Sequence, residues 1–192
     1  MNLNLEQQVN KLLNYLNIHY PHEIDIEAIA YACKAEVFPT SIRSHCIAHP
    51  TKIGWSGLYI NDQLSLPEWR QTVAHELCHH VLHVASHLEI SNLHIQRHEI
   101  QAAHFAEYLL VPLHMINHDD IAHINYLDEG IRWIAEEFVV PLDLAKIDGK
   151  PGMHKTLMFK EAMYKCVLLS IFVYQLTCKQ KKVLALRGNV VV

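Results

Sequence analysis

Apolar residues recur every three to four positions in several parts of the chain, a spacing that predicts amphipathic helices. Two of these helices have clear start signals. Asp25 precedes one as a capping residue, and Ser65 and Glu68 form a capping-box pattern ahead of another. Asp128 is the expected cap of a later helix. The predicted helices cover residues 5–16, 26–33, 66–84, 95–110, 129–138 and 141–147.

Three short segments between the second and third predicted helices are predicted to be β-strands. They cover residues 35–38, 44–48 and 56–60, and Pro50 and Gly54 separate the last two. We expect these strands to form a small antiparallel sheet. The predicted fold class is therefore α+β, in which the sheet packs on a helical core that carries the two longest helices.

The length and composition fit one globular domain with an appendage. The chain has 192 residues, of which 51% are hydrophobic, enough to bury a core. Gly149 to Gly152 interrupts the pattern, so we expect a domain at residues 1–148 and an appendage at 149–192. The five cysteines lack a paired spacing, and the first residues lack the features of a signal peptide. We therefore expect the protein to be located in the cytoplasm, where thiols stay reduced.

The predicted appendage differs from the domain in charge and hydropathy. Residues 1–145 carry 7 Lys and Arg against 18 Asp and Glu, whereas residues 146–192 carry 9 against 2. The negative charge of the domain disfavours direct binding of nucleic acid. Only the basic tail has a charge that would permit such binding. Residues 157–178 are apolar on nearly all sides, but their uncharged run of about 11 to 13 residues is short for a bilayer. We expect a buried helix there, with membrane attachment as the less favoured alternative.

One pattern indicates a specific chemistry. His75, Glu76 and His79 form the sequence H-E-x-x-H inside a predicted helix. Histidines four residues apart lie on one helix face, one turn apart, so both imidazoles can reach a single metal ion, and zinc is the ion that this pattern favours. Glu76 lies about 100° around the helix from His75, where it can take a proton from water without entering the coordination shell. Glu76 is the predicted general base.

A third ligand is predicted on the following helix. A helical wheel of residues 95–110 places Glu99 among small and apolar residues, on the face expected to pack inward. Burying an unpaired carboxylate is costly, and a cation that it binds removes that cost. Glu99 would complete a zinc site with His75 and His79 that leaves one position open for water.

These motifs resemble those of a known family. Residues 74–83 read A-H-E-L-C-H-H-V-L-H and residues 99–112 read E-I-Q-A-A-H-F-A-E-Y-L-L-V-P, which look like the signature segments of the ImmA/IrrE family of zinc-dependent metallopeptidases. The resemblance implies that His75, His79 and Glu99 bind zinc (Zn2+) and that Glu76 is the catalytic residue. It also implies a protein substrate, a helix-turn-helix transcriptional repressor of a mobile element or a stress response, cut at a peptide bond.

The sequence departs from the family pattern at two positions. Cys78 stands where the family usually has glycine, and Ala103 stands where it usually has Asn or Asp. Cys78 is interpreted as a small side chain within the helix, with a redox-sensitive thiol as the alternative. A polar side chain one turn after Glu99 could hydrogen-bond a zinc-bound histidine, a contact whose loss typically weakens metal affinity or activity about 10- to 100-fold. Either another group replaces it, or this member is less active than its relatives.

The sequence leaves alternatives open at the site. His79 and His83 are also one turn apart and could bind the metal in a shifted register, and His75 and His79 could instead be a surface pair. An oxyanion formed during peptide hydrolysis needs a stabilising donor. The candidate donors are His104, Tyr108, His114 and Tyr126.

Two other functions fit the same residues. A non-catalytic relative could keep the zinc site and act by binding and sequestering a repressor, which the missing polar residue at Ala103 favours. A histidine-rich metal carrier is the second alternative, because the chain contains 16 histidines. A carrier would bind several exchangeable ions, whereas a peptidase centre holds one ion tightly.

Overall fold

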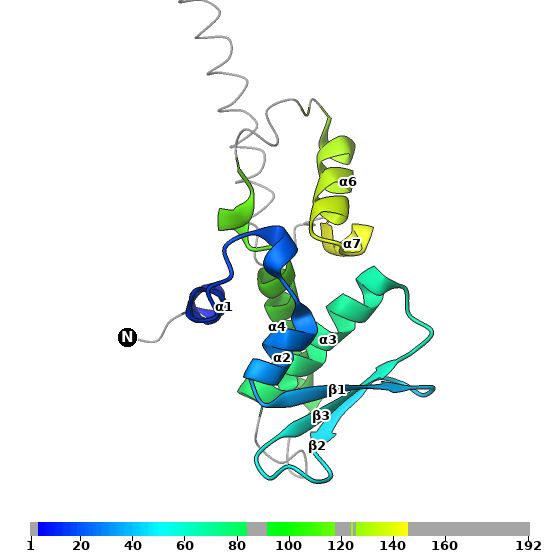
Figure 1. Cartoon of the computed structure of the whole chain (residues 1–192). Coiled ribbons are helices and arrows are strands. Elements are labelled where there is room, and N and C mark those ends of the chain that lie inside the picture. Colours follow the sequence, from blue (N-terminus) through cyan, green and yellow to red (C-terminus); the bar gives the residue numbers. More distant parts are fainter. Residues whose placement is uncertain (1–3, 84–91, 118–123, 125, 146–192) are drawn as a thin grey trace, which may run out of the picture. The chain divides into compact units, whose positions relative to one another are not determined.

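The computed structural model describes residues 4–83, 92–117, 124 and 126–145 (Figure 1). All helices and strands given below belong to one compact unit, which comprises residues 1–115 and 125–146. A second unit comprises Ile116–Ile124 and residues 147–192, and only three of its residues are among those described. The domain boundary expected at residue 148 and the apolar tail helix lie outside the described residues. Among the described residues, no helix has the length and hydropathy to cross a membrane.

The observed helices agree closely with those predicted from the apolar spacing. They are α1 (Leu5–Tyr15), η1 (Pro21–Glu23), α2 (Ile26–Ala32), α3 (Leu66–Leu82), α4 (Asn92–Leu110), η3 (Leu113–Met115), α6 (Leu127–Glu137) and α7 (Leu142–Ala145).

The start signals of α2 and α3 act as predicted. A side-chain oxygen of Asp25 accepts hydrogen bonds from the backbone N–H groups of Glu27 and Ala28, both at 3.1 Å. Ser65 donates to the Glu68 carboxylate from its backbone N–H at 2.9 Å and from its hydroxyl at 2.6 Å. The cap predicted for α6 is wrong, because Asp128 lies in the first turn and Tyr126 precedes the helix.

The three strands form a mixed sheet, so the predicted antiparallel arrangement is only half right. Strands β1 (Ala35–Thr40), β2 (His45–Ala48) and β3 (Ser56–Asn61) lie in the order β1-β3-β2. β2 pairs antiparallel to β3, but β1 pairs parallel to it. The reason is that β3 inserts between β1 and β2 and does not add at an edge. Alternation along a strand reports which side chains share a face, and it does not report which strand is the neighbour.

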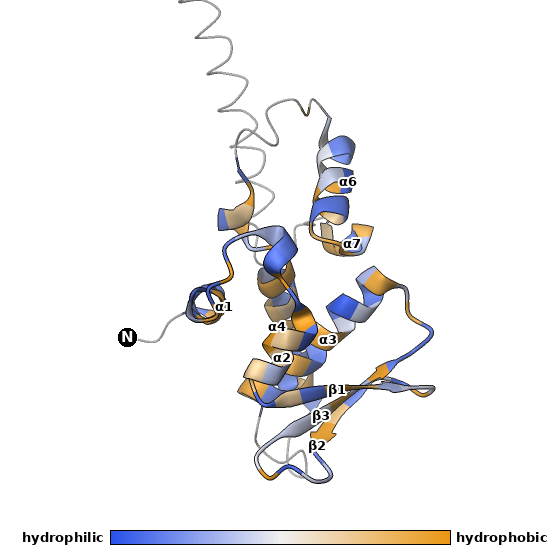
Figure 2. Cartoon of the chain, viewed as in Figure 1, coloured by the Kyte–Doolittle hydropathy of each residue, from blue (hydrophilic) through white to orange (hydrophobic). Residues whose placement is uncertain are grey.

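The core forms where α3 packs against the sheet on one side and against α4 and α2 on others (Figures 1 and 2). The α3 residues that face inward are fully buried, and so are Leu58 and Ile60 of β3. Burying a Leu or Ile side chain contributes about 1.5–3 kcal/mol, so these residues fix α3 against β3. Val81, one turn after Leu77, is 39% exposed, so the buried face of α3 does not extend to the end of the helix. The buried residues of α3 are Val73, Ala74, Leu77 and Cys78.

Arg70 connects the first half of α3 to two distant segments. Its guanidinium donates to the carbonyl oxygen of Ile24 at 3.0 Å and to that of Phe138, after α6, at 3.5 Å. The Nε atom is buried without a hydrogen-bond partner. Burial lowers the pKa of the Arg70 guanidinium, while the charge of Asp25 opposes that effect. These contacts tie α3 to the start of α2 and to the end of α6.

Candidate metal centre

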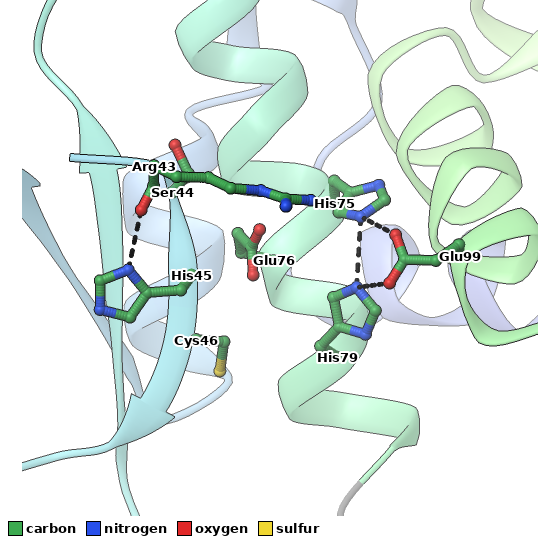
Figure 3. A pocket seen from close by; sticks show the side chains of 8 residues that line it. All are labelled: Arg43, Ser44, His45, Cys46, His75, Glu76, His79 and Glu99. Carbon is green, nitrogen blue, oxygen red and sulfur yellow. Dashed lines mark hydrogen bonds and ion pairs between the residues drawn. The ribbon is translucent and has the colours of Figure 1, made fainter. Parts of the chain in front are cut away.

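Three side chains from two helices converge at one point (Figure 3). Nε2 of His75 and Nε2 of His79 on α3 lie 3.2 Å apart. The carboxylate of Glu99 on α4 reaches both rings, with 3.2 Å from Oε2 to His75 Nε2 and 3.5 Å from Oε1 to His79 Nε2. The structure therefore brings together the three residues that the sequence singled out.

These distances fit a tetrahedral metal ion. Nitrogen and oxygen ligands at about 2.0–2.1 Å from zinc, with tetrahedral angles, are about 3.3 Å from one another. The separations observed here are 3.2, 3.2 and 3.5 Å. Two imidazoles and one carboxylate can thus hold one cation while a fourth position stays open, as in catalytic zinc sites.

Glu76 lies beside this cluster and does not belong to it. Burial raises the pKa of Glu76 to about 7, and the negative charge of Glu99 adds to the effect, whereas the positive charges of His45 and Arg43 oppose it. A carboxyl group with a pKa near neutrality is suited to exchange a proton with a substrate. The role of Glu76 as general base stays a prediction.

The cluster opens into a pocket of about 480 Å³ between α3, α4 and the sheet (Figure 3). One wall consists of the segment that leads into β2 and the start of that strand. Sequence reasoning missed this wall, because a strand pattern does not report which helix the strand will approach. The pocket is lined by Arg43, Ser44, His45, Cys46, His75, Glu76, His79 and Glu99.

The prediction that Glu99 lies on a buried face is wrong, although its place beside the histidines is as predicted. The Glu99 side chain is 53% exposed, and Ile95 is 43% exposed. The buried residues of α4 begin only at Ala102. A helical wheel reports direction around a helix but not the point along it where the core ends. Glu99 therefore lies at the rim of the pocket.

The neighbouring histidines have other partners. His80 donates from Nε2 to the carbonyl oxygen of Cys33 at 2.8 Å, and its Nδ1 lies 2.7 Å from the hydroxyl of Ser56. His80 therefore ties α3 to the sheet and to the end of α2. Nδ1 of His83 lies 3.0 Å from Nδ1 of His79, which is the nitrogen that faces away from Glu99. This contact disfavours the shifted register, since His83 approaches the rear of His79 and not the cluster.

The four residues considered as oxyanion donors do not line the pocket. Nδ1 of His104 pairs with Glu107 at 3.3 Å, Tyr108 stacks near His104, and Tyr126 is 74% exposed. The pocket-lining side chains outside the cluster that can donate a hydrogen bond include Arg43, Ser44 and His45. Nδ1 of His45 donates to the carbonyl oxygen of Arg43 at 2.9 Å, and the ring stacks on Tyr59.

The two departures from the family pattern have different surroundings. Cys78 is fully buried, and burial raises the pKa of its thiol to about 12, with the charge of Glu99 adding to the effect. Such a thiol stays neutral, which favours the interpretation of a small buried side chain. Ala103 is exposed, so a polar residue at this position of α4 would remain in contact with solvent.

A helix carrying H-E-x-x-H that faces a glutamate on the next helix is a site of the metallopeptidase type. Residues 39–147 match the model of the peptidase M78 family, described as the IrrE N-terminal-like domain, so the chain belongs to this family. The matched segment begins near the end of β1 and includes β2, β3, α3, α4 and the whole cluster. The resemblance to the ImmA/IrrE family is thereby confirmed.

A more distant similarity connects the chain to a protein of a phage-like element. It is 29% identical over 141 residues to the phage-like element PBSX protein XkdA of Bacillus subtilis (strain 168). The alignment covers 73% of this chain and 69% of that protein. A metallopeptidase-like role is therefore supported by the family match and by a His-His-Glu cluster able to hold a metal.

Proposed function

We propose that this chain is a zinc-dependent endopeptidase, and that its substrate is a helix-turn-helix transcriptional repressor of a mobile element or a stress response. The observation that carries the proposal is the convergence of His75, His79 and Glu99 within a pocket that also contains Glu76. The family match supports the reaction class. The similarity to a protein named for a phage-like element supports the class of substrate.

In this proposal His75, His79 and Glu99 hold the zinc ion, and Glu76 is the catalytic residue. Zinc in such a site supplies Lewis acidity, which polarises a scissile carbonyl and acidifies a water molecule. Glu76 accepts the proton of the attacking water and then delivers it to the nitrogen of the leaving amine. Burial of Glu76, which raises the pKa of its carboxyl group, favours the uptake of a proton from the water.

The sheet supports an extended substrate. β2 pairs with β3 along one edge, and among the described strands no other pairs with its second edge. An extended peptide can bind such an edge through backbone hydrogen bonds, and β2 begins at the wall of the pocket. A peptide bound in this way would lie next to the pocket that contains the cluster. Arg43 and His45 would then be available to stabilise an oxyanion.

The proposal is tested by incubating the purified zinc-loaded protein with the repressor encoded nearest to it and detecting fragments by mass spectrometry. The wild type should cleave the repressor at one site, and Glu76→Gln should bind the repressor without cleaving it. Binding without cleavage by the wild type would favour the alternative of a sequestering protein. If the wild type neither binds nor cleaves the repressor, this repressor is excluded as the substrate. A wild type that retains no zinc would contradict the proposed reaction.

A further inference from the structure

The two ring nitrogens of His79 have different environments. Nε2 faces His75 and Glu99, whereas Nδ1 lies 3.0 Å from Nδ1 of His83. His83 is only 8% exposed, and its second nitrogen, Nε2, lies 3.1 Å from the side-chain oxygen of Gln101 on α4. A continuous row of polar contacts therefore runs from Gln101 through His83 to the rear of His79.

The chemistry of these groups determines the order of the hydrogens. An amide oxygen only accepts, so Nε2 of His83 must donate to Gln101. A neutral imidazole carries one hydrogen, so Nδ1 of His83 is then an acceptor. Nδ1 of His79 must donate to it, so Nε2 of His79 carries no hydrogen and its lone pair points toward His75 and Glu99. A metal ion binds only an imidazole nitrogen that carries no hydrogen.

We propose that His83 and Gln101 are positioning residues that hold His79 in the tautomer and orientation needed to bind a metal through Nε2. The inference rests on the metal centre described under Proposed function. Glu99 and Gln101 both belong to α4, so one helix supplies a ligand and also the group that orients another ligand.

The surroundings of His83 hold its ring in place. The ring of His98 stacks on it with a centroid distance of 4.0 Å and an interplanar angle of 13°. The backbone N–H of His83 donates to the carbonyl oxygen of His79 at 3.2 Å, which fixes the end of α3. The ring is thus restrained on its face by His98 and at its edge by Gln101, so it can fix the direction of its own contact with His79.

The first ligand lacks an equivalent support. In the part of the chain that the structure describes, the hydrogen bonds of the His75 side chain involve Nε2, and none reaches Nδ1. The position one turn after Glu99 is Ala103, whose methyl group cannot accept a hydrogen bond. The orienting contact of this centre is therefore made to His79 and comes from a different pair of residues.

The tautomers can be measured directly in the metal-free protein. Long-range nitrogen–proton NMR of histidine-labelled protein, above the pH range in which histidines titrate, should show hydrogen on Nδ1 of His79 and on Nε2 of His83. The opposite order, with hydrogen on Nε2 of His79, would overturn the proposal, because Gln101 would then be donating. This measurement does not depend on metal binding or on activity.

Zinc affinity, measured by competition with a chelator, supplies the second test. Gln101→Leu and His83→Phe remove the contact and should weaken binding about 10- to 100-fold. Gln101→Glu keeps an acceptor for Nε2 of His83 and should therefore retain the zinc affinity of the wild type. His104→Phe changes a histidine of α4 outside this row and serves as the matched control. Unchanged affinity in both disruptive variants would overturn the proposal, whereas absence of zinc binding by the wild type would contradict the metal centre itself.

Discussion

Nε2 of His75 and Oε2 of Glu99 lie 3.2 Å apart, although 24 residues separate them in the chain. Nothing local to either helix requires this contact, which exists because α3 and α4 pack extensively against each other. The exposed carboxylate of Glu99 faces two imidazole nitrogens, an arrangement that a cation bound by all three would stabilise.

Glu99→Ala should abolish zinc binding, because two histidines alone provide too few ligands for a tight site. Elemental analysis of purified wild type should find about one equivalent of zinc per chain. Glu107→Ala, also on α4, is the matched control and should leave the zinc content unchanged. Full zinc occupancy in Glu99→Ala would show that the third ligand is a different group.

Glu76→Gln should separate catalysis from metal binding. The amide cannot accept a proton from water, so proteolysis should fall by about 10²- to 10⁴-fold while the zinc content stays the same. Cleavage of the repressor at 25 °C and elemental analysis check the two halves of this prediction. Glu68→Gln, at the exposed start of the same helix, should retain both properties. Loss of zinc from Glu76→Gln would mean that Glu76 is a ligand.

Ala103→Asp should tighten zinc binding by about tenfold if the new carboxylate reaches Nδ1 of His75. Ala103 is exposed, so this carboxylate stays hydrated and the melting temperature of the metal-free protein should not fall. Ile100→Asp adds the same charge at a 59% exposed position of α4 and controls for general electrostatic attraction. An equal gain in affinity in both variants would exclude a specific contact with His75.

The capping contact of Glu68 should make the stability of the metal-free protein depend on pH. Hydrogen bonds from the side chain and backbone of Ser65 lower the pKa of the Glu68 carboxyl below its usual value. The carboxylate therefore stabilises the fold above the ordinary pKa of about 4.3, and this contribution is lost as pH falls through the lower folded-state pKa. The melting temperature of the wild type should exceed that of Glu68→Gln at pH 7, and the gap should close in acid. A gap independent of pH would mean that the charge is not involved.

Val139→Asn should stabilise the protein by about 1 kcal/mol. Val139 follows α6 with φ of 51°, a left-handed conformation that is strained for a β-branched residue and acceptable for Asn. Urea unfolding of the metal-free protein measures the change. The converse test is Lys34→Val, which places a β-branched residue at φ of 65° and should destabilise the protein by a similar amount. A less stable Val139→Asn variant would show that the packing of the valine outweighs the strain.

The sequence by itself determined the features that depend on neighbours along the chain. The spacing of His75 and His79 places both on one face of any helix, and the caps at Asp25 and Ser65 start their helices through hydrogen bonds that span two to three residues. The apolar period then located most helices correctly, because one buried face is enough to produce it.

Only the tertiary structure decided the features that depend on which elements become neighbours. The insertion of β3 between β1 and β2 brings the segment from Arg43 to Cys46 to the pocket, and no local pattern contains that information. The packing of α4 on α3 leaves Glu99 exposed at the rim and brings Gln101 to His83. Periodicity reports direction around a helix, whereas contacts between helices depend on where along their length they meet, and packing of the whole core sets that position.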